Sequence, residues 1–176
     1  MSPPGLRRAL LAAASLSLSA LLLRGFVANA LVSRGDEFLL GGDLATSRVY
    51  FARALWLDPN CESAIERYTF ASLQLRDGPA LRAAIGTAGD YLRRHPAALS
   101  LRIDRALALY VAGNEREAAA ELAAAGRESG DFRLYGLAAH AALRAREPAV
   151  ARAAYRSALA INPSYRQARL ALRAAP

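Results

Sequence analysis

A six-residue motif that ends in proline occurs twice in the chain, and its spacing indicates the period of a repeated structural unit. Residues 54–59 and 158–163 share the pattern Ala-Leu-x-(Leu or Ile)-(Asp or Asn)-Pro. Pro96 lies between the two motifs, 37 residues after Pro59 and 67 residues before Pro163. The longer spacing is close to two units of about 34 residues, with the middle boundary near Gly130. Such a period predicts stacked copies of one small structural unit.

The composition indicates that each unit is helical. The chain is 54% hydrophobic and only 7% aromatic, and its apolar residues are mainly alanine and leucine, which favour closely packed helices. No alternating run rich in Val, Ile and Thr indicates a strand. The fold class is therefore predicted to be all-α. We expect helices at about 5–26, 28–40, 44–57, 61–75, 79–94, 97–112, 115–128, 132–145, 148–161 and 164–174.

Short polar turns separate the paired helices. Gly42 and Gly113 can adopt the left-handed backbone conformation that ends a helix without strain from a side chain. Asp43 and Asn114 follow them and are expected to accept hydrogen bonds from the free N–H groups of the next helix. These turns predict antiparallel helix pairs.

The residues inside the first and fourth units resemble the consensus of the tetratricopeptide repeat family. In the first unit the matching positions are Leu31, Gly35, Phe38, Ser47, Phe51 and Ala54. In the fourth they are Tyr135, Ala138, Ala139, Ala142, Ala151, Tyr155 and Ala158. The second unit is the most degenerate, because Asp77-Gly78-Pro79 replaces the tight turn.

This resemblance implies an architecture and a kind of function. It implies a right-handed superhelical array of helix-turn-helix repeats, with units at about 28–61, 62–98, 99–131 and 132–165 and a capping helix at 166–176. In this family the first helix of each pair lines a groove that binds a peptide or a partner helix. Carried over by position, the groove residues are Asp36, Leu39, Leu40, Phe70, Leu73, Ile103, Leu107, Tyr110, His140 and Arg144.

An export or anchoring segment is predicted ahead of the repeats, at residues 1–27. Arg7 and Arg8 precede a run of 15 uncharged residues, Ala9 to Leu23, which Arg24 ends. A basic start followed by an apolar run is typical of segments read by the export machinery. The flanking arginines predict a cytoplasmic start and repeats that face the periplasm or the exterior.

The sequence leaves three interpretations of this segment open. The first is a removed signal peptide. Fifteen helical residues span about 22 Å, which is less than the roughly 30 Å hydrocarbon layer, and Ala28-Asn29-Ala30 could be a cleavage site. The second is an uncleaved single-pass anchor, because the apolar stretch continues past Arg24, whose side chain could snorkel to the far interface. A buried cytosolic helix is the third interpretation.

Basic residues are concentrated at the two ends of the chain. All 23 basic residues are arginine, and the formal net charge is +8. Residues 30–131 carry 12 arginines and 14 acids, whereas residues 132–176 carry eight arginines and one acid, Glu147. We expect a basic patch at Arg166, Arg169 and Arg173. Few aromatic residues lie among these arginines, which disfavours nucleic acid as the ligand.

The sequence contains no recognisable catalytic or metal-binding pattern. Cys61 is the only cysteine and the two histidines, His95 and His140, are isolated, so metal or disulfide chemistry has few ligands. We expect no enzyme activity, no metal and no cofactor. The predicted function is a protein-interaction scaffold or assembly factor on the outer side of the bacterial cytoplasmic membrane. The alternative is a binder of an acidic surface, polyanion or nucleic acid through the arginine-rich C-terminal repeat.

Overall fold

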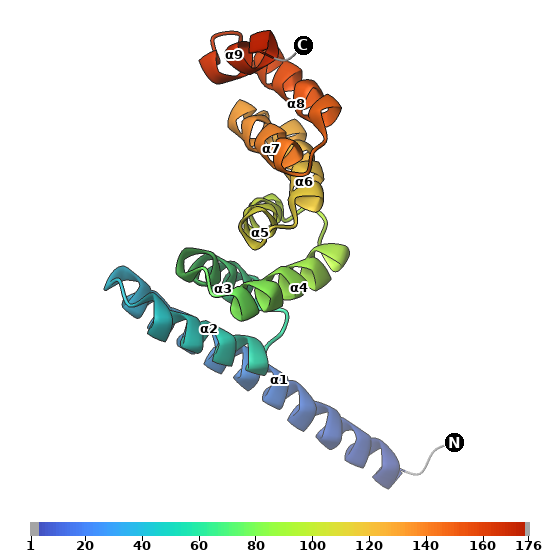
Figure 1. The fold of residues 1–176 in the computed structure, drawn as a ribbon. Coiled ribbons are helices and arrows are strands. Elements are labelled where there is room, and N and C mark those ends of the chain that lie inside the picture. The colour runs from blue at the N-terminus through green and yellow to red at the C-terminus, as the bar shows by residue number, and fades with distance from the viewer. Residues whose placement is uncertain (1–3, 175–176) are drawn as a thin grey trace. The chain divides into compact units, whose positions relative to one another are not determined.

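The computed structural model describes residues 4–174, and this range contains nine helices and no strand (Figure 1). The side chains are described for residues 14, 15, 19 and 21–173. The helices are α1 (Pro4–Leu40), α2 (Leu44–Leu57), α3 (Glu62–Leu75), α4 (Gly78–Arg94), α5 (Leu99–Ala112), α6 (Glu115–Ser129), α7 (Phe132–Arg144), α8 (Pro148–Ile161) and α9 (Arg166–Ala174). The predicted all-α class is confirmed, and from residue 44 onward the predicted helix ends agree within two residues.

The prediction of two separate helices at 5–26 and 28–40 is wrong, because α1 runs through both ranges without a break. No proline interrupts Arg24 to Ala28, and Gly25 in a helix interior costs only about 1 kcal/mol relative to alanine. The apolar segment and the first repeat therefore share one helix. The first residues of the predicted export segment, 1–3, and the end of the predicted cap, 175–176, lie outside the described residues.

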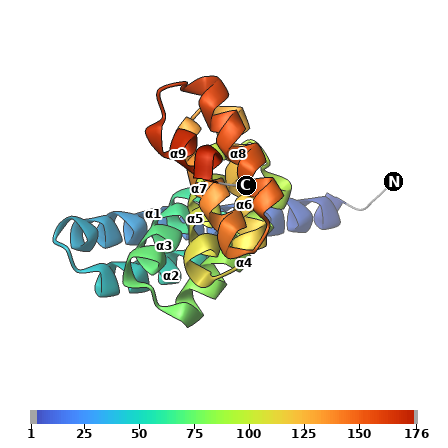
Figure 2. The ribbon, with the colours of Figure 1, turned by 45° about the horizontal axis from the view of Figure 1, so that its top comes forward.

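The chain divides into two compact units, Met1–Ala71 and Ser72–Pro176. The division falls inside α3, within the repeat that departs most from the consensus. In the first unit α1 and α2 lie side by side and antiparallel, and α1 extends well past the end of α2 (Figures 1 and 2). The right-handed superhelical path stays a prediction.

Gly35 and Phe51 lie in close contact between the paired helices of the first unit. Phe51 is fully buried, together with Ala28, Ala54 and Ser47. A methyl group built on Gly35 would lie 2.5 Å from the ring carbon Cε1 of Phe51, which is closer than real side chains approach. The glycine therefore makes room for the aromatic ring between the two helices.

The turns follow their predicted chemistry at one position and depart from it at another. Gly42 and Gly113 have φ angles of +81° and +85°, in the left-handed region. The carboxylate of Asp43 accepts a hydrogen bond of 3.0 Å from the backbone N–H of Thr46, and this bond lowers the pKa of Asp43. The Asn114 side chain makes no capping hydrogen bond, so that prediction is wrong. Two glutamates in the first turn of α6, Glu115 and Glu117, offset its positive N-terminal end instead.

The core of the second unit is built mainly from alanine. Ala106, Ala118, Ala139 and Ala151 are at most 1% exposed and lie in the shared core of α5 to α8. Small side chains allow close helix contact, and the larger gaps between turns are filled by residues such as Tyr155, which is 3% exposed. Burial raises the pKa of the Tyr155 hydroxyl above its ordinary value.

Candidate functional site

Four of the predicted groove residues lie in the first unit, and they differ in burial and in chemical character. Asp36 is held in an ion pair with Arg67, with 2.9 Å between Oδ1 and Nε. Leu39 packs against the core of this unit, whereas Leu40 is 89% exposed at the end of α1. Phe70 is 39% exposed on α3. Among these four residues, the exposed apolar area is therefore limited to Leu40 and part of Phe70.

The apolar groove residues of the second unit are also partly used by the fold. Leu73, Ile103, Leu107 and Tyr110 pack against the alanine-rich core and are only half-buried. Part of each of these side chains therefore stays accessible to a partner.

Tyr110 and Arg144 come together, although 34 residues separate them in the sequence. The guanidinium carbon of Arg144 lies 4.9 Å from the centre of the Tyr110 ring, over its face. Arg144 Nη2 also lies 2.9 Å from a carboxylate oxygen of Glu115, at the start of α6. The half-exposed Arg144 is therefore held between a ring and a carboxylate at the C-terminal ends of α5 and α7.

His140 lies against the predicted capping helix. Its Nε2 is 2.5 Å from the amide nitrogen of Gln167 on α9, and its ring stands edge-to-face with Tyr155. The Tyr165 hydroxyl donates to the Gln167 side-chain oxygen at 2.8 Å. His140 therefore belongs to a polar chain that joins α7 to α9. The sequence predicts Gln167 on the polar outer face of the cap but does not predict its contact with His140, because no local pattern indicates a partner 27 residues away.

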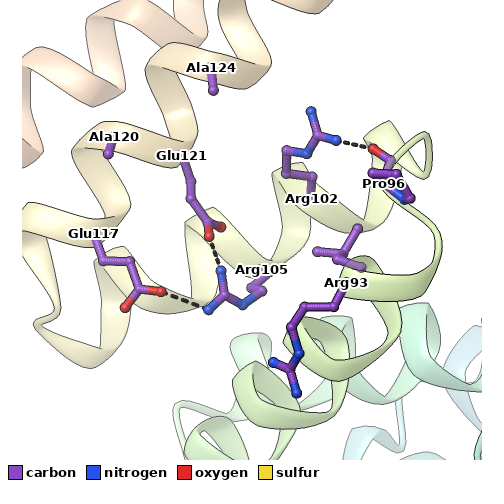
Figure 3. A pocket seen from close by; sticks show the side chains of 10 residues that line it. Arg93, Pro96, Arg102, Arg105, Glu117, Ala120, Glu121 and Ala124 are labelled. Carbon is purple, nitrogen blue, oxygen red and sulfur yellow. Dashed lines mark hydrogen bonds and ion pairs between the residues drawn. The ribbon is translucent and has the colours of Figure 1, made fainter.

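A pocket of about 490 Å³ opens between α4, α5 and α6, and the sequence did not predict it (Figure 3). Its walls combine charged and apolar side chains. The charged ones are Arg93, Arg102, Arg105, Glu117 and Glu121, and the apolar ones are Leu92, Pro96, Ala120 and Ala124. Arg105 projects from α5 toward the two glutamates of α6, as the dashed lines in Figure 3 show.

Arg105 links the three helices that form this pocket. Its Nη2 lies 2.7 Å from Glu117, its Nη1 pairs with Glu121, and its Nε donates to the backbone oxygen of Ile85 on α4 at 3.2 Å. The Arg105 side chain is only 15% exposed. All three nitrogens of the guanidinium are thus engaged within the protein, which indicates a structural role.

The other two arginines of the pocket also have partners within the protein. Arg102 pairs with Glu128 and donates to the backbone oxygen of Pro96. Arg93 lies 2.6 Å from Asp90. Each positive charge in the pocket is matched by a carboxylate of the chain, so the pocket does not favour an ionic ligand.

The predicted basic patch forms one continuous surface on α9. Arg166, Arg169 and Arg173 line a shallow hollow together with Leu170, which is 52% exposed. On the opposite side of the helix Ala168 is fully buried in the core of the second unit. The fold therefore turns the three arginines outward.

Two features of the described residues bear on metal and membrane chemistry. No group of three His, Cys, Asp or Glu side chains among them could hold a metal ion. Within residues 4–174, no helix is both long enough and apolar enough to cross a membrane. The lone Cys61 is buried, with its Sγ 3.4 Å from the Ser63 hydroxyl.

The fold can be compared with known proteins. A scan against protein-family models and a search of curated proteins found no match. Among solved structures, the chain is similar to a thermophilic TPR protein of Thermus thermophilus, with 18% sequence identity and a TM-score of 0.45. The match covers 83% of this chain and 99% of that chain. The chain is an all-helical repeat array that is similar to this protein, and the likeness concerns the fold alone.

Proposed function

We propose that the chain is a protein-interaction scaffold that binds a segment of a partner along the first helices of its repeats. We further propose that α1 holds the scaffold on the outer side of a bacterial cytoplasmic membrane. The observation that carries the first proposal is the surface at the C-terminal ends of α5 and α7, where Tyr110 and Arg144 meet. We call this surface the α5–α7 edge and define it by Tyr110, Val111, Leu143 and Arg144.

The α5–α7 edge offers two kinds of contact. Val111 is 39% exposed and Leu143 is 48% exposed, so both can bury further apolar area against a partner. The Arg144 guanidinium is held in place by Tyr110 and Glu115 and is half-exposed, so it can donate to a carbonyl or carboxylate of the partner. These residues fit a mildly amphipathic segment that presents an apolar side chain next to an acceptor oxygen.

Crosslinking from defined positions tests this surface. A photoreactive residue at Leu143 or Val111 is expected to give one discrete crosslinked product in cells, because the partner segment would lie on these side chains. The matched control carries the same residue at Ala120, which is exposed on α6 and outside the α5–α7 edge. The expected product should disappear when Arg144 is replaced by glutamate. Equal crosslinking from Ala120, or a product that survives Arg144→Glu, would contradict the proposal.

The exposed residues of α1 support the proposed membrane attachment. Leu21, Leu22 and Leu23 are 62%, 67% and 63% exposed, and Phe26 is 73% exposed. Successive helical residues point about 100° apart, so Leu21, Leu22 and Leu23 cover about two thirds of the helix circumference, and Arg24 takes the remaining side. This wide apolar surface is stable where apolar surroundings cover it, as lipid does.

The contact between α1 and the end of α2 assigns a role to Arg24. Its Nε donates to the backbone oxygen of Leu57 at 2.9 Å, which satisfies a free carbonyl at the end of α2. In the structure Arg24 is thus bound to the first repeat rather than extended along α1. The neighbouring Trp56 is 80% exposed, and tryptophan is enriched where proteins meet the membrane interface.

A topology reporter tests the attachment. A reporter that is active only after export, fused after Pro176, is expected to be active, and the fusion should stay with the membrane after alkaline extraction. The arginines before the apolar run predict this orientation. The control fuses a reporter that is active only in the cytosol at the same point. Activity of the cytosolic reporter would contradict the orientation, and release of an active exported fusion by alkali would indicate a removed signal peptide.

A further inference from the structure

The outer face of α9 carries a stripe of positive charge. Arg166, Arg169 and Arg173 follow one another at spacings of three and four residues, which places them on one side of a helix over about 10 Å. Leu170 lies among them and is 52% exposed. The stripe therefore combines three guanidinium groups with one apolar side chain.

The acidic residues nearest in sequence do not compensate this charge. Residues 148–176 contain five arginines and no acid at all. Glu147 lies 2.6 Å from Arg116 of α6, and Asp131 lies 3.1 Å from Arg133. Glu115 is engaged by Arg144. These three carboxylates are therefore engaged by arginines outside α9 and do not neutralise the stripe.

We propose that this outer face of α9 docks on an anionic lipid surface, with the three guanidinium groups at the level of the lipid phosphates and Leu170 between them. Guanidinium groups bind phosphate oxygens through paired hydrogen bonds, and basic stripes on short helices are attracted to negatively charged leaflets. The Leu170 side chain adds apolar contact at the boundary of the headgroups. This binding site is distinct from the α5–α7 edge and does not depend on it.

The distribution of charge favours a lipid surface over an acidic protein. A protein partner is held in register by a specific pattern of complementary charges across the interface. Over the last 29 residues this chain has only positive charges, carried on both α8 and α9. A broad area of positive charge complements a flat lipid surface that is uniformly negative, and binding to such a surface requires no fixed register.

The test uses the full chain with lipid bilayer discs of two compositions. One set contains phosphatidylcholine alone, and the other contains equal parts of phosphatidylcholine and phosphatidylglycerol. A polarity-sensitive fluorophore is attached at Leu170→Cys in a Cys61→Ala background, and docking is read as a blue shift. We expect the shift with the anionic discs only, and its loss as salt is raised.

Charge removal on α9 gives the decisive comparison. The triple variant Arg166→Gln, Arg169→Gln and Arg173→Gln is expected to weaken docking by about 100-fold, since each arginine contributes about a factor of five at an anionic membrane. The control triple Arg82→Gln, Arg93→Gln and Arg127→Gln removes the same charge from exposed positions on α4 and α6 and is expected to leave docking unchanged. A second control places the fluorophore at Ala120, where no shift is expected.

Three outcomes would overturn the proposal. The first is equal shifts with neutral and anionic discs, and the second is an equal loss in both triple variants. The third combines two measurements on the α9 triple variant: docking on anionic discs is unchanged, but binding to soluble polyglutamate, a mimic of an acidic protein, is lost. That result would assign the stripe to an acidic protein partner. Attachment through α1 is measured separately, as co-flotation of the unlabelled chain with neutral discs in a density gradient. If the chain does not float with neutral discs, its salt-sensitive co-flotation with anionic discs still tests docking through α9.

Discussion

Replacing Gly35 by alanine is expected to lower the free energy of unfolding of the first unit by about 3 kcal/mol. The added methyl group would meet the Phe51 ring at 2.5 Å, and this ring is fully buried. The two helices α1 and α2 cannot separate without exposing their shared core, which includes Ala28 of α1 and Ala54 of α2. Overpacking of this kind forces side chains off their preferred conformations or separates the helices.

Hydrogen exchange of the α2 amides measures this effect within the first unit. A loss of about 3 kcal/mol corresponds to about 100-fold faster exchange when opening is the limiting equilibrium. The matched control is Gly25→Ala on the same helix, where a methyl group would meet nothing within 4 Å. That change is expected to stabilise α1 by about 0.5–1 kcal/mol through helix propensity.

A second substitution tests whether the ring is the cause. Phe51→Leu removes the aromatic atoms that the new methyl group would meet, so the double variant should be less destabilised than the sum of the two single changes. We expect a coupling energy of about 1–2 kcal/mol. Additive effects, or a Gly35→Ala protein as stable as Gly25→Ala, would show that the two helices do not approach as the structure describes.

Replacing Arg105 by methionine is expected to destabilise the second unit by about 2–3 kcal/mol. The change removes the group that neutralises Glu117 and Glu121 and that binds the Ile85 carbonyl. Glu121 Oε2 is buried, and no hydrogen-bond donor among the described residues reaches it. Loss of one partner from a fully buried ion pair costs about 3–5 kcal/mol, and the smaller value here reflects the partial exposure of the two glutamates.

Urea unfolding followed by circular dichroism, with hydrogen exchange of α5 and α6, measures the Arg105 effect. Arg127→Met is the matched control, because it removes an exposed arginine from α6. Adding Glu121→Gln to Arg105→Met should recover part of the lost stability, because a neutral amide then replaces the partly buried carboxylate. If Arg105→Met were as stable as the control, the ion pairs would be dispensable surface contacts.

The local structure of this protein was readable from its sequence. Helix ends depend on short-range signals, such as the left-handed glycine Gly42, the capping Asp43 and the helix-starting Pro148, and these act within a few residues. Gly35 and Phe51 both matched the repeat consensus in the sequence, and the structure shows that they meet across the helix pair. The all-α class and the antiparallel pairs followed from such signals.

One error at this level also has a local explanation. Residues 1–27 were assigned to an export or anchoring segment and the residues from 28 onward to the first repeat, and each was given its own helix. Helix continuity depends on backbone hydrogen bonds and not on such a division, so α1 continues through Gly25. A boundary between predicted roles was therefore mistaken for a helix boundary.

The partners of individual side chains were decided only by the tertiary structure. Arg24 binds the end of α2, Arg105 joins α4 to α6, and His140 contacts Gln167, over sequence separations of 16 to 33 residues. The charge count of the C-terminal repeat could not tell which arginines are neutralised, whereas the fold pairs Arg144 with Glu115 and leaves the α9 stripe facing outward. Sequence periodicity determines which face of a helix is buried. The packing of that face then determines which distant charges come within reach of one another.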